Sequence, residues 1–233
     1  MKVGIIQSNY IPWRGYFDFI DAVDLFIFHD DLQYTKNDWR NRNKIKTDKG
    51  TTWLTVSVNY KSTSQLICDT SIDYSHRWNQ KHINQIQQYY CKAPYFSEYS
   101  NDLFDMLKHK FLTISDLNIT LCKWVMEKLD IETPLHLSSE FQPQGKKTER
   151  LIDMLNKVGA TTYLSGPTAK GYLEEEKFKQ AGIGLEYKVY DYPDYPQLYG
   201  KFEPQVSVLD LLFNCGEDSK KFIKSLKQNQ KVV

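Results

Sequence analysis

The chain has 233 residues, of which 41% are hydrophobic and 25% are charged, so it suits a globular protein with one large domain. Its 30 basic and 29 acidic residues give a net charge of +1, which provides no global field to recruit nucleic acid or an anionic membrane. Four cysteines without zinc spacing, no apolar run near the ~20 residues that cross a bilayer, and no signal peptide predict a cytoplasmic protein with free thiols.

The N-terminal stretch predicts a strand, a loop and a helix. Val3 to Ile6 is an apolar run of strand length, and apolar residues recur at helical spacing from Tyr16 to Val23. The loop between them is rich in polar and aromatic side chains, where a simple connector usually carries Gly, Ser and Asp. Because ligands of open parallel sheets bind at the carboxyl ends of strands, we predict that this loop contacts a substrate. Its predicted substrate-binding residues are Gln7, Asn9, Tyr10, Trp13, Arg14 and Tyr16. The alternative is a helix-entry turn with Trp13 packed beneath the loop.

A second strand is predicted from Asp24 to Phe28, and His29, Asp30 and Asp31 follow it. Two adjacent carboxylates can hold Mg²⁺ or a ligand's hydroxyl groups, and a histidine titrates near neutral pH. In an extended segment Asp30 and Asp31 point to opposite faces, so we expect only one of them in a site. These three residues are the predicted catalytic group, and a solvated strand end is the alternative.

The segment from Gln33 to Lys46 is polar and cationic, and we predict that it binds phosphate and sugar groups. The residues concerned are Gln33, Arg40, Asn41, Arg42 and Lys44. Basic and aromatic residues in alternation also suit single-stranded nucleic acid, but the near-zero net charge and the lack of an RNA-binding signature favour a nucleotide or nucleotide-sugar. A solvated basic hairpin is the alternative. Ile45 to Val58 is predicted to form a strand pair attached to the main sheet.

The rest of the chain predicts an α/β fold with a mostly parallel, doubly wound sheet and a helical insertion. Three helices are predicted at roughly 76–90, 95–110 and 115–129. Strands at 133–138, 161–164 and 184–189 then alternate with helices at 146–158 and 172–181, and a last helix starts at 207. The predicted division is 1–75 and 132–233 for the α/β part, with 76–131 as the insertion. The lysine-rich tail, 220–233, is predicted to fray.

Two later loops are further binding candidates, and no metal-ligating set is predicted. The glycine-containing turn from Ser165 to Tyr172 follows a strand and can hold phosphate through backbone N–H groups, although its residues are not in P-loop order. A tight strand-to-helix turn is an equal alternative. Tyr190 to Phe202 is rich in aromatic residues and proline, which suits a sugar or nucleobase site, or else a lid packed on the core. The predicted binding residues here are Ser165, Gly166, Tyr172 and Tyr195.

Several of these segments resemble the WbqC-like protein family. They are Gln7 to Phe17, Asp30 to Tyr34, Trp39 to Asn43, Tyr163 to Pro167 with Tyr172 and Leu173, Tyr195 to Phe202, and Ser207 to Asn214. They follow the family's order over nearly the whole chain. Ser8 is a departure, since the family commonly has proline there, and it leaves the loop freer without removing a chemical group.

The resemblance implies a role in surface-polysaccharide (O-antigen) biosynthesis, with transfer of glycine or another acyl group onto a nucleotide-linked amino sugar. The donor would be activated by ATP with Mg or as an acyl-thioester. ATP-dependent ligation like that of pantothenate synthetase agrees with the opening loop, which lies where nucleotidylyltransferases place their His-x-Gly-His loop. In this scheme the arginines and Lys44 hold phosphates, the amide groups orient the sugar or acyl group, and His29 or Asp30 is the base. The alternatives are a non-catalytic nucleotide-sugar-binding protein of the same pathway and a nucleotidylyltransferase-like enzyme.

Overall fold

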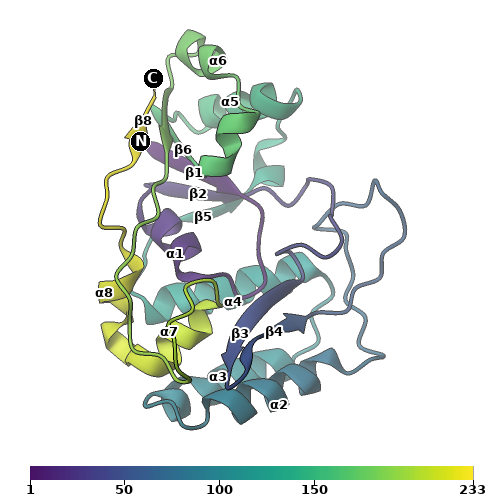
Figure 1. Ribbon diagram of the computed structural model, residues 1–233. Coiled ribbons are helices and arrows are strands. Elements are labelled where there is room, and N and C mark those ends of the chain that lie inside the picture. Colours follow the sequence, from purple (N-terminus) through teal and green to yellow (C-terminus); the bar gives the residue numbers. More distant parts are fainter. Residues whose placement is uncertain (233) are drawn as a thin grey trace.

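The computed structural model describes residues 1–232, whose central element is a six-stranded sheet (Figure 1). Its strands are β1 (Lys2–Ile6), β2 (Leu25–Phe28), β5 (Leu135–Leu137), β6 (Thr162–Ser165), β7 (Gly184–Tyr187) and β8 (Gln230–Lys231). They lie in the spatial order β5-β2-β1-β6-β7-β8, and all neighbours are parallel except β7 and β8. The predicted α/β fold with a mostly parallel sheet is therefore confirmed.

The strand order locates the point where a ligand is expected. β2 and β5 follow β1 in one direction across the sheet, whereas β6 and β7 lie on the other side of β1. The order therefore reverses between β1 and β6. In open α/β sheets the ligand crevice lies outside the carboxyl ends of the strands at this reversal. Here those ends are Ile6 and Ser165.

Helices cover both faces of the sheet because its strands are apolar on both sides. Phe26 and Phe28 of β2 belong to the larger core with α1 (Arg14–Asp21) and α4 (Ile114–Lys128). Leu25 and Ile27 alternate with them and belong to the second core, with α5 (Lys147–Lys157) and α6 (Glu175–Gln180). Figure 1 shows α1 and α4 below the sheet and α5 and α6 above it.

The predicted helices of the middle segment are present as α2 (Trp78–Tyr90), α3 (Phe96–Lys108) and α4. Their apolar faces join the larger core, which continues through the sheet and α7 (Val208–Cys215). No helix within residues 1–232 has both the length and the apolar character to cross a bilayer. All four cysteines are free thiols, as predicted.

The predicted attachment of the hairpin to the main sheet is wrong. β3 (Arg42–Thr47) and β4 (Gly50–Thr55) pair with each other in a separate two-stranded sheet (Figure 1). Ile45 and Leu54 are fully buried on one face of this hairpin, while Arg42, Lys44 and Trp53 on its other face are at least partly exposed. Such a one-sided pattern does not fit a parallel sheet that is buried on both faces.

The predicted fraying of the C-terminal tail is also wrong. After two short helical turns, η3 (Gly216–Ser219) and α8 (Lys220–Ile223), the chain returns to the sheet as β8. Ile223 is buried in the larger core, so an apolar anchor lies among the lysines of this tail. Val233 lies outside the described residues.

Two single-turn 3-10 helices complete the fold. η1 (Ser138–Phe141) follows β5, and η2 (Pro167–Gly171) follows β6. The helix predicted from 172 therefore begins only at Glu175, because η2 occupies the chain between the strand and the helix.

Candidate functional site

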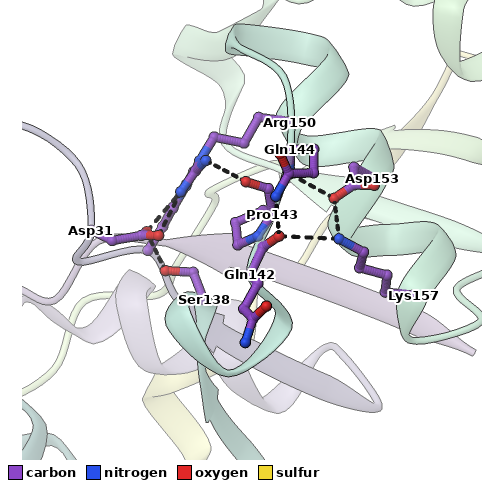
Figure 2. A network of polar contacts seen from close by, with 9 residues as sticks. Asp31, Ser138, Gln142, Pro143, Gln144, Arg150, Asp153 and Lys157 are labelled. Carbon is purple, nitrogen blue, oxygen red and sulfur yellow. Dashed lines mark hydrogen bonds and ion pairs between the residues drawn. The ribbon is translucent and has the colours of Figure 1, made fainter.

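The carboxyl ends of β2 and β5 bring together His29, Asp31, Ser138 and Arg150, which we name the β2-end cluster. Figure 2 shows Asp31 between its partners Ser138 and Arg150. Arg150 Nη2 donates to Asp31 Oδ2 at 2.5 Å, and Ser138 Oγ donates to the other carboxylate oxygen. Arg150 Nε donates to His29 Nε2 at 3.3 Å. An arginine fork thus holds a carboxylate and an imidazole in fixed positions.

Arg150 is held in turn by the loop before α5. Its Nη1 donates to the carbonyl of Pro143 at 2.7 Å. Lys157, farther along the same helix, donates to the carbonyl of Gln142 at 3.1 Å and pairs with Asp153 at 2.7 Å, so helix and loop are clamped together (Figure 2). These contacts make Arg150 a positioning residue, since its N–H groups are directed to protein acceptors.

His29 is neutral near pH 7. Burial is the largest cause of its low pKa of about 4; Asp31 opposes this effect and Arg150 adds to it. A neutral imidazole accepts the Arg150 hydrogen bond through Nε2. Because a general base works best with a pKa near the working pH, His29 is poorly tuned for that role at neutral pH.

Asp30 is enclosed and points away from Asp31. Its Oδ1 accepts the Ser8 backbone N–H at 2.8 Å, and its Oδ2 accepts the hydroxyl of Ser115 on α4. Burial raises the pKa of Asp30, and the hydrogen bonds from Ser115 and Ser8 oppose this. The two carboxylates therefore face different layers, as the alternation of an extended segment predicted. Among residues 1–232 no group of three or more His, Cys, Asp or Glu is placed to hold a metal ion.

The carboxyl end of β1 carries a second group, Gln7, Asn9 and Arg40, which we name the β1-end cluster. Arg40 Nη1 donates to Asn9 Oδ1, and Nη2 donates to Gln7 Oε1 at 3.3 Å. Asp38 lies 3.5 Å from the same guanidinium. The structure therefore brings together three of the predicted substrate-binding residues at the reversal point of the sheet.

Buried hydrogen bonds connect the ends of β1 and β2. Asn118 Nδ2, on α4, donates to Ser8 Oγ at 3.2 Å and to the carbonyl of Arg40 at 2.8 Å. Ser8 in turn donates its backbone N–H to Asp30. Asp30 thus belongs to the framework that fixes the polar loop, rather than to its exposed surface.

Other predicted residues of the opening loop lie inside the protein. Tyr10 is fully buried, and its hydroxyl is hydrogen-bonded to His82 Nδ1 on α2 at 2.8 Å. Tyr16 is buried and donates to the carbonyl of Gln7 at 3.0 Å. Their rings hold the loop against the core and offer no surface to a ligand. Burial raises the pKa of both hydroxyls, with a smaller effect of Tyr74 on Tyr10.

Arg14 and Tyr195 form an internal clamp. Arg14 Nη1 donates to the carbonyls of Pro193 and Phe222 at 2.8 and 3.1 Å. Its guanidinium lies 4.7 Å from the ring centroid of Tyr192 and 5.1 Å from that of Tyr195, and burial lowers its pKa. Arg14 therefore joins α1 to the loop from Tyr190 to Phe202, which we name the aromatic loop, and to the C-terminal tail.

Trp13 joins the same region. Its ring lies edge-on to Tyr190, with centroids 5.0 Å apart. A Cβ on Gly15 would lie only 2.4 Å from the Trp13 ring, so glycine is required for the ring to fold back over the helix start. Trp13 thus contacts the start of α1 and the loop that contains Tyr190.

The other predicted binding residues are divided between framework and surface. Asn41 is buried and donates to the carbonyl of Val56 at 2.9 Å. Arg42 and Lys44 lie on the outward face of the hairpin, and Gln33 is exposed in a backbone bridge with Leu66.

The carboxyl end of β6 lies beside that of β1, on the other side of the point where the strand order reverses. Ser165 is buried, and its carbonyl accepts the N–H of Lys188 at 2.8 Å. Gly166 is half-buried and directly precedes η2, whereas Tyr172 is 68% exposed after that turn. Ser165 and Gly166 thus neighbour the end of β1, and Tyr172 lies on the surface.

The sequence did not reveal Ser138, Arg150 or Asn118 as parts of this region. Ser138 follows a short strand, which is the same signal that selected His29 to Asp31. Arg150 and Asn118 lie inside amphipathic helices, where a polar residue ordinarily faces solvent.

The comparisons with known proteins concern nearly the whole chain. The model of the WbqC-like protein family matches residues 7–222. The uncharacterized protein Rv1507c of Mycobacterium tuberculosis (strain ATCC 25618 / H37Rv) is 44% identical over 230 residues, which cover 97% of this chain and 99% of that protein. No solved structure matches the chain. The resemblance seen in the sequence is confirmed: the chain belongs to the WbqC-like protein family.

Proposed function

We propose that the protein is a transferase or ligase that attaches a glycyl or other acyl group to a nucleotide-linked amino sugar in surface-polysaccharide (O-antigen) biosynthesis. The observation that supports this most is the convergence of the β1-end and β2-end clusters on the carboxyl edge of the parallel sheet. The resemblance of the chain to its family supplies the pathway.

In this proposal the β1-end cluster binds the sugar. Gln7 and Asn9 present amide groups beside the Arg40 guanidinium, a set that can donate to and accept from hydroxyl and acetamido groups. Arg42 and Lys44, on the adjoining hairpin, supply positive charge for phosphates. The fold is proposed to be nucleotidylyltransferase-like, with Mg·ATP or an acyl-thioester as the source of activation.

Amide formation needs a proton acceptor near the amine. The amine nitrogen forms a C–N bond with the acyl carbon, the bond from that carbon to its adenylate or thiol leaving group breaks, and the amine loses a proton. We assign the acceptor to Asp31, a partly exposed carboxylate held by Ser138 and Arg150. Such a base contributes about 10²–10⁴-fold in rate. Asp30 is too enclosed for this role.

A second candidate is a nucleotide-sugar-binding protein without catalytic activity. It is favoured by the contacts of Asp31, since both carboxylate oxygens already accept hydrogen bonds, and by the pKa of His29 near 4. A rigid, fully bonded polar group is suited to recognition as well as to catalysis.

Mass spectrometry of reaction mixtures separates these two functions. The protein is incubated with a nucleotide-linked amino sugar and with glycine plus Mg·ATP, or with acyl-thioesters. The proposal predicts an acylated sugar, and loss of at least 10²-fold in rate with unchanged sugar affinity in Asp31→Asn. Asp105→Asn, at an exposed ion pair with Lys108 on α3, is the matched control and retains the rate. Sugar binding without product from any donor would favour the binding protein.

A further inference from the structure

Two tryptophans lie exposed beside the β1-end cluster. Trp39 is 45% exposed and Trp53 is 39% exposed, and their ring centroids are 5.7 Å apart with 41° between the planes. Trp39 directly precedes Arg40, and its carbonyl accepts the N–H of Tyr10 at 2.9 Å. The tryptophan pair is therefore fixed to the same loop that carries Gln7 and Asn9. Exposed aromatic pairs at a fixed position are characteristic of recognition surfaces.

The hairpin surface around Trp53 is cationic. Lys44 lies directly opposite Trp53 in the β3–β4 ladder, and Arg42 lies two residues before Lys44 on the same face. The Arg42 guanidinium is 4.2 Å and the Lys44 ammonium 5.1 Å from the centre of the Trp53 ring. Lys46, the next residue of β3 on this side, is buried and donates to Gln197 Oε1 at 2.9 Å. The residues opposite Arg42 and Lys46 are threonines, so this side of the hairpin carries no carboxylate.

The combination of rings and cations selects a class of ligand. An exposed π-face stacks on any nucleobase, and adjacent cations attract phosphate. A neutral sugar would use the rings but not the cations. A single-stranded nucleic acid needs a longer basic groove, whereas the net charge of this chain is only +1.

We propose that Trp39 and Trp53 form the stacking platform for the nucleobase of a nucleoside diphosphate, with Arg42 and Lys44 facing its phosphates. The inference rests on the proposed function and adds to it the part of the site that reads the nucleotide. The nucleotide then lies over the hairpin, and the attached sugar extends toward Arg40 and the end of β1.

Calorimetric titration with UDP, dTDP and GDP, and with pyrophosphate as a probe without a base, tests this platform. We expect Trp53→Ala to weaken binding of the preferred nucleoside diphosphate by about tenfold or more, since one stacked base contributes ~1–3 kcal/mol. Trp53→Phe retains most of the affinity because it keeps an aromatic face, whereas Trp53→Leu does not. Arg42→Gln is expected to weaken the binding of both the nucleoside diphosphate and pyrophosphate. Trp53→Ala is expected to leave the binding of pyrophosphate unchanged.

Two controls separate loss of stacking from loss of structure. Leu226→Ala truncates another exposed apolar side chain, 71% exposed in the tail, and is expected to leave nucleotide affinity unchanged. The circular dichroism spectrum of each variant is expected to match the wild type, since Trp53 faces outward and the inward face of the hairpin keeps Ile45 and Leu54.

The inference is overturned if the wild type binds none of the diphosphates, or if Trp53→Ala binds them as tightly as the wild type. It is also overturned if a single-stranded oligonucleotide binds more tightly than every diphosphate with a steep salt dependence. Failure of the proposed function has a different signature: Trp53-dependent nucleotide binding persists, but no donor yields an acylated sugar.

Discussion

At the scale of single residues, Arg150 sets the electrostatics of the β2-end cluster. It donates to His29 Nε2 and to the Asp31 carboxylate, and its charge disfavours a proton on His29. Burial is the larger cause of the low pKa of His29, and it does not depend on Arg150. The two contributions can be separated by a substitution on α5.

Arg150→Gln is expected to raise the pKa of His29 from about 4 toward, but not to, the usual value of 6.5. The positive charge is lost while the burial remains. NMR titration of the imidazole resonances measures the change. Lys108→Gln, at an exposed ion pair with Asp105 on α3, is the control and should leave the titration of His29 unaltered. An unchanged or lower pKa in Arg150→Gln would contradict the assignment.

The local sequence predicted one half of this cluster and not the other. An apolar strand followed by His29, Asp30 and Asp31 identifies a strand end, because the change from apolar to polar is visible over a few residues. Ser138 is 107 residues from Asp31 and Arg150 is 119 residues away. Contacts at such separations depend on strand order and helix placement, which periodicity does not encode. Burial of Tyr10 and Arg14 was missed for the same reason.

At the scale of elements, a buried ion pair joins α1 to the chain after β7. Lys188 Nζ donates to Asp18 Oδ1 at 2.7 Å, and both side chains are almost fully buried. The other carboxylate oxygen accepts the hydroxyl of Tyr192 at 2.6 Å and the N–H of Ser225 at 3.2 Å. Helix, aromatic loop and tail are thus held at one carboxylate.

Lys188→Met is expected to lower the free energy of unfolding by about 3–5 kcal/mol, because it leaves the Asp18 carboxylate buried without its cation. The double variant Asp18→Asn with Lys188→Met should lose less, since no unpaired charge remains. Urea denaturation compares them. Lys221→Met, at an exposed pair with Asp218, is the control and should unfold as the wild type does. A double variant at least as unstable as Lys188→Met would show that the charge is not the cause.

The elements that the sequence predicted well are those with a local signal. The three helices between 76 and 130 have clear apolar stripes, and the hairpin has a turn signal that ends at Gly50, whose φ of +112° suits glycine. The partner of a strand has no such signal. The hairpin therefore could be predicted but not its separation from the main sheet, and the two residues of β8 are too few to show a period.

At the scale of the whole molecule, buried histidines make stability dependent on pH. Burial lowers the pKa of His29 to about 4 and that of His82 to about 3. Below the unfolded value of about 6.5, protons bind the unfolded chain while the folded histidines stay neutral, so stability falls as the pH drops toward 4. Asp30 and Asp210 act in the opposite direction, because burial raises their pKa values.

Comparison with His29→Gln isolates one of these contributions. Between pH 7 and pH 5, the free energy of unfolding of the wild type is expected to fall by about 2 kcal/mol more than that of this variant. The reason is that His29 takes up a proton in this pH range only in the unfolded chain. Denaturant titrations at the two pH values measure this difference. His76→Gln, at an exposed position, should follow the wild type. Equal losses in the wild type and His29→Gln would refute the account.

A crystal structure of the protein with a bound nucleotide-linked amino sugar would show where the sugar lies. We expect the sugar at the carboxyl edge of the sheet, in contact with Arg40, Gln7 or Asn9 and with its amine directed toward Asp31. A ligand in the cavity of about 540 Å³ between β5 and α4, lined by Phe111, Ile119 and Leu135, would contradict this placement.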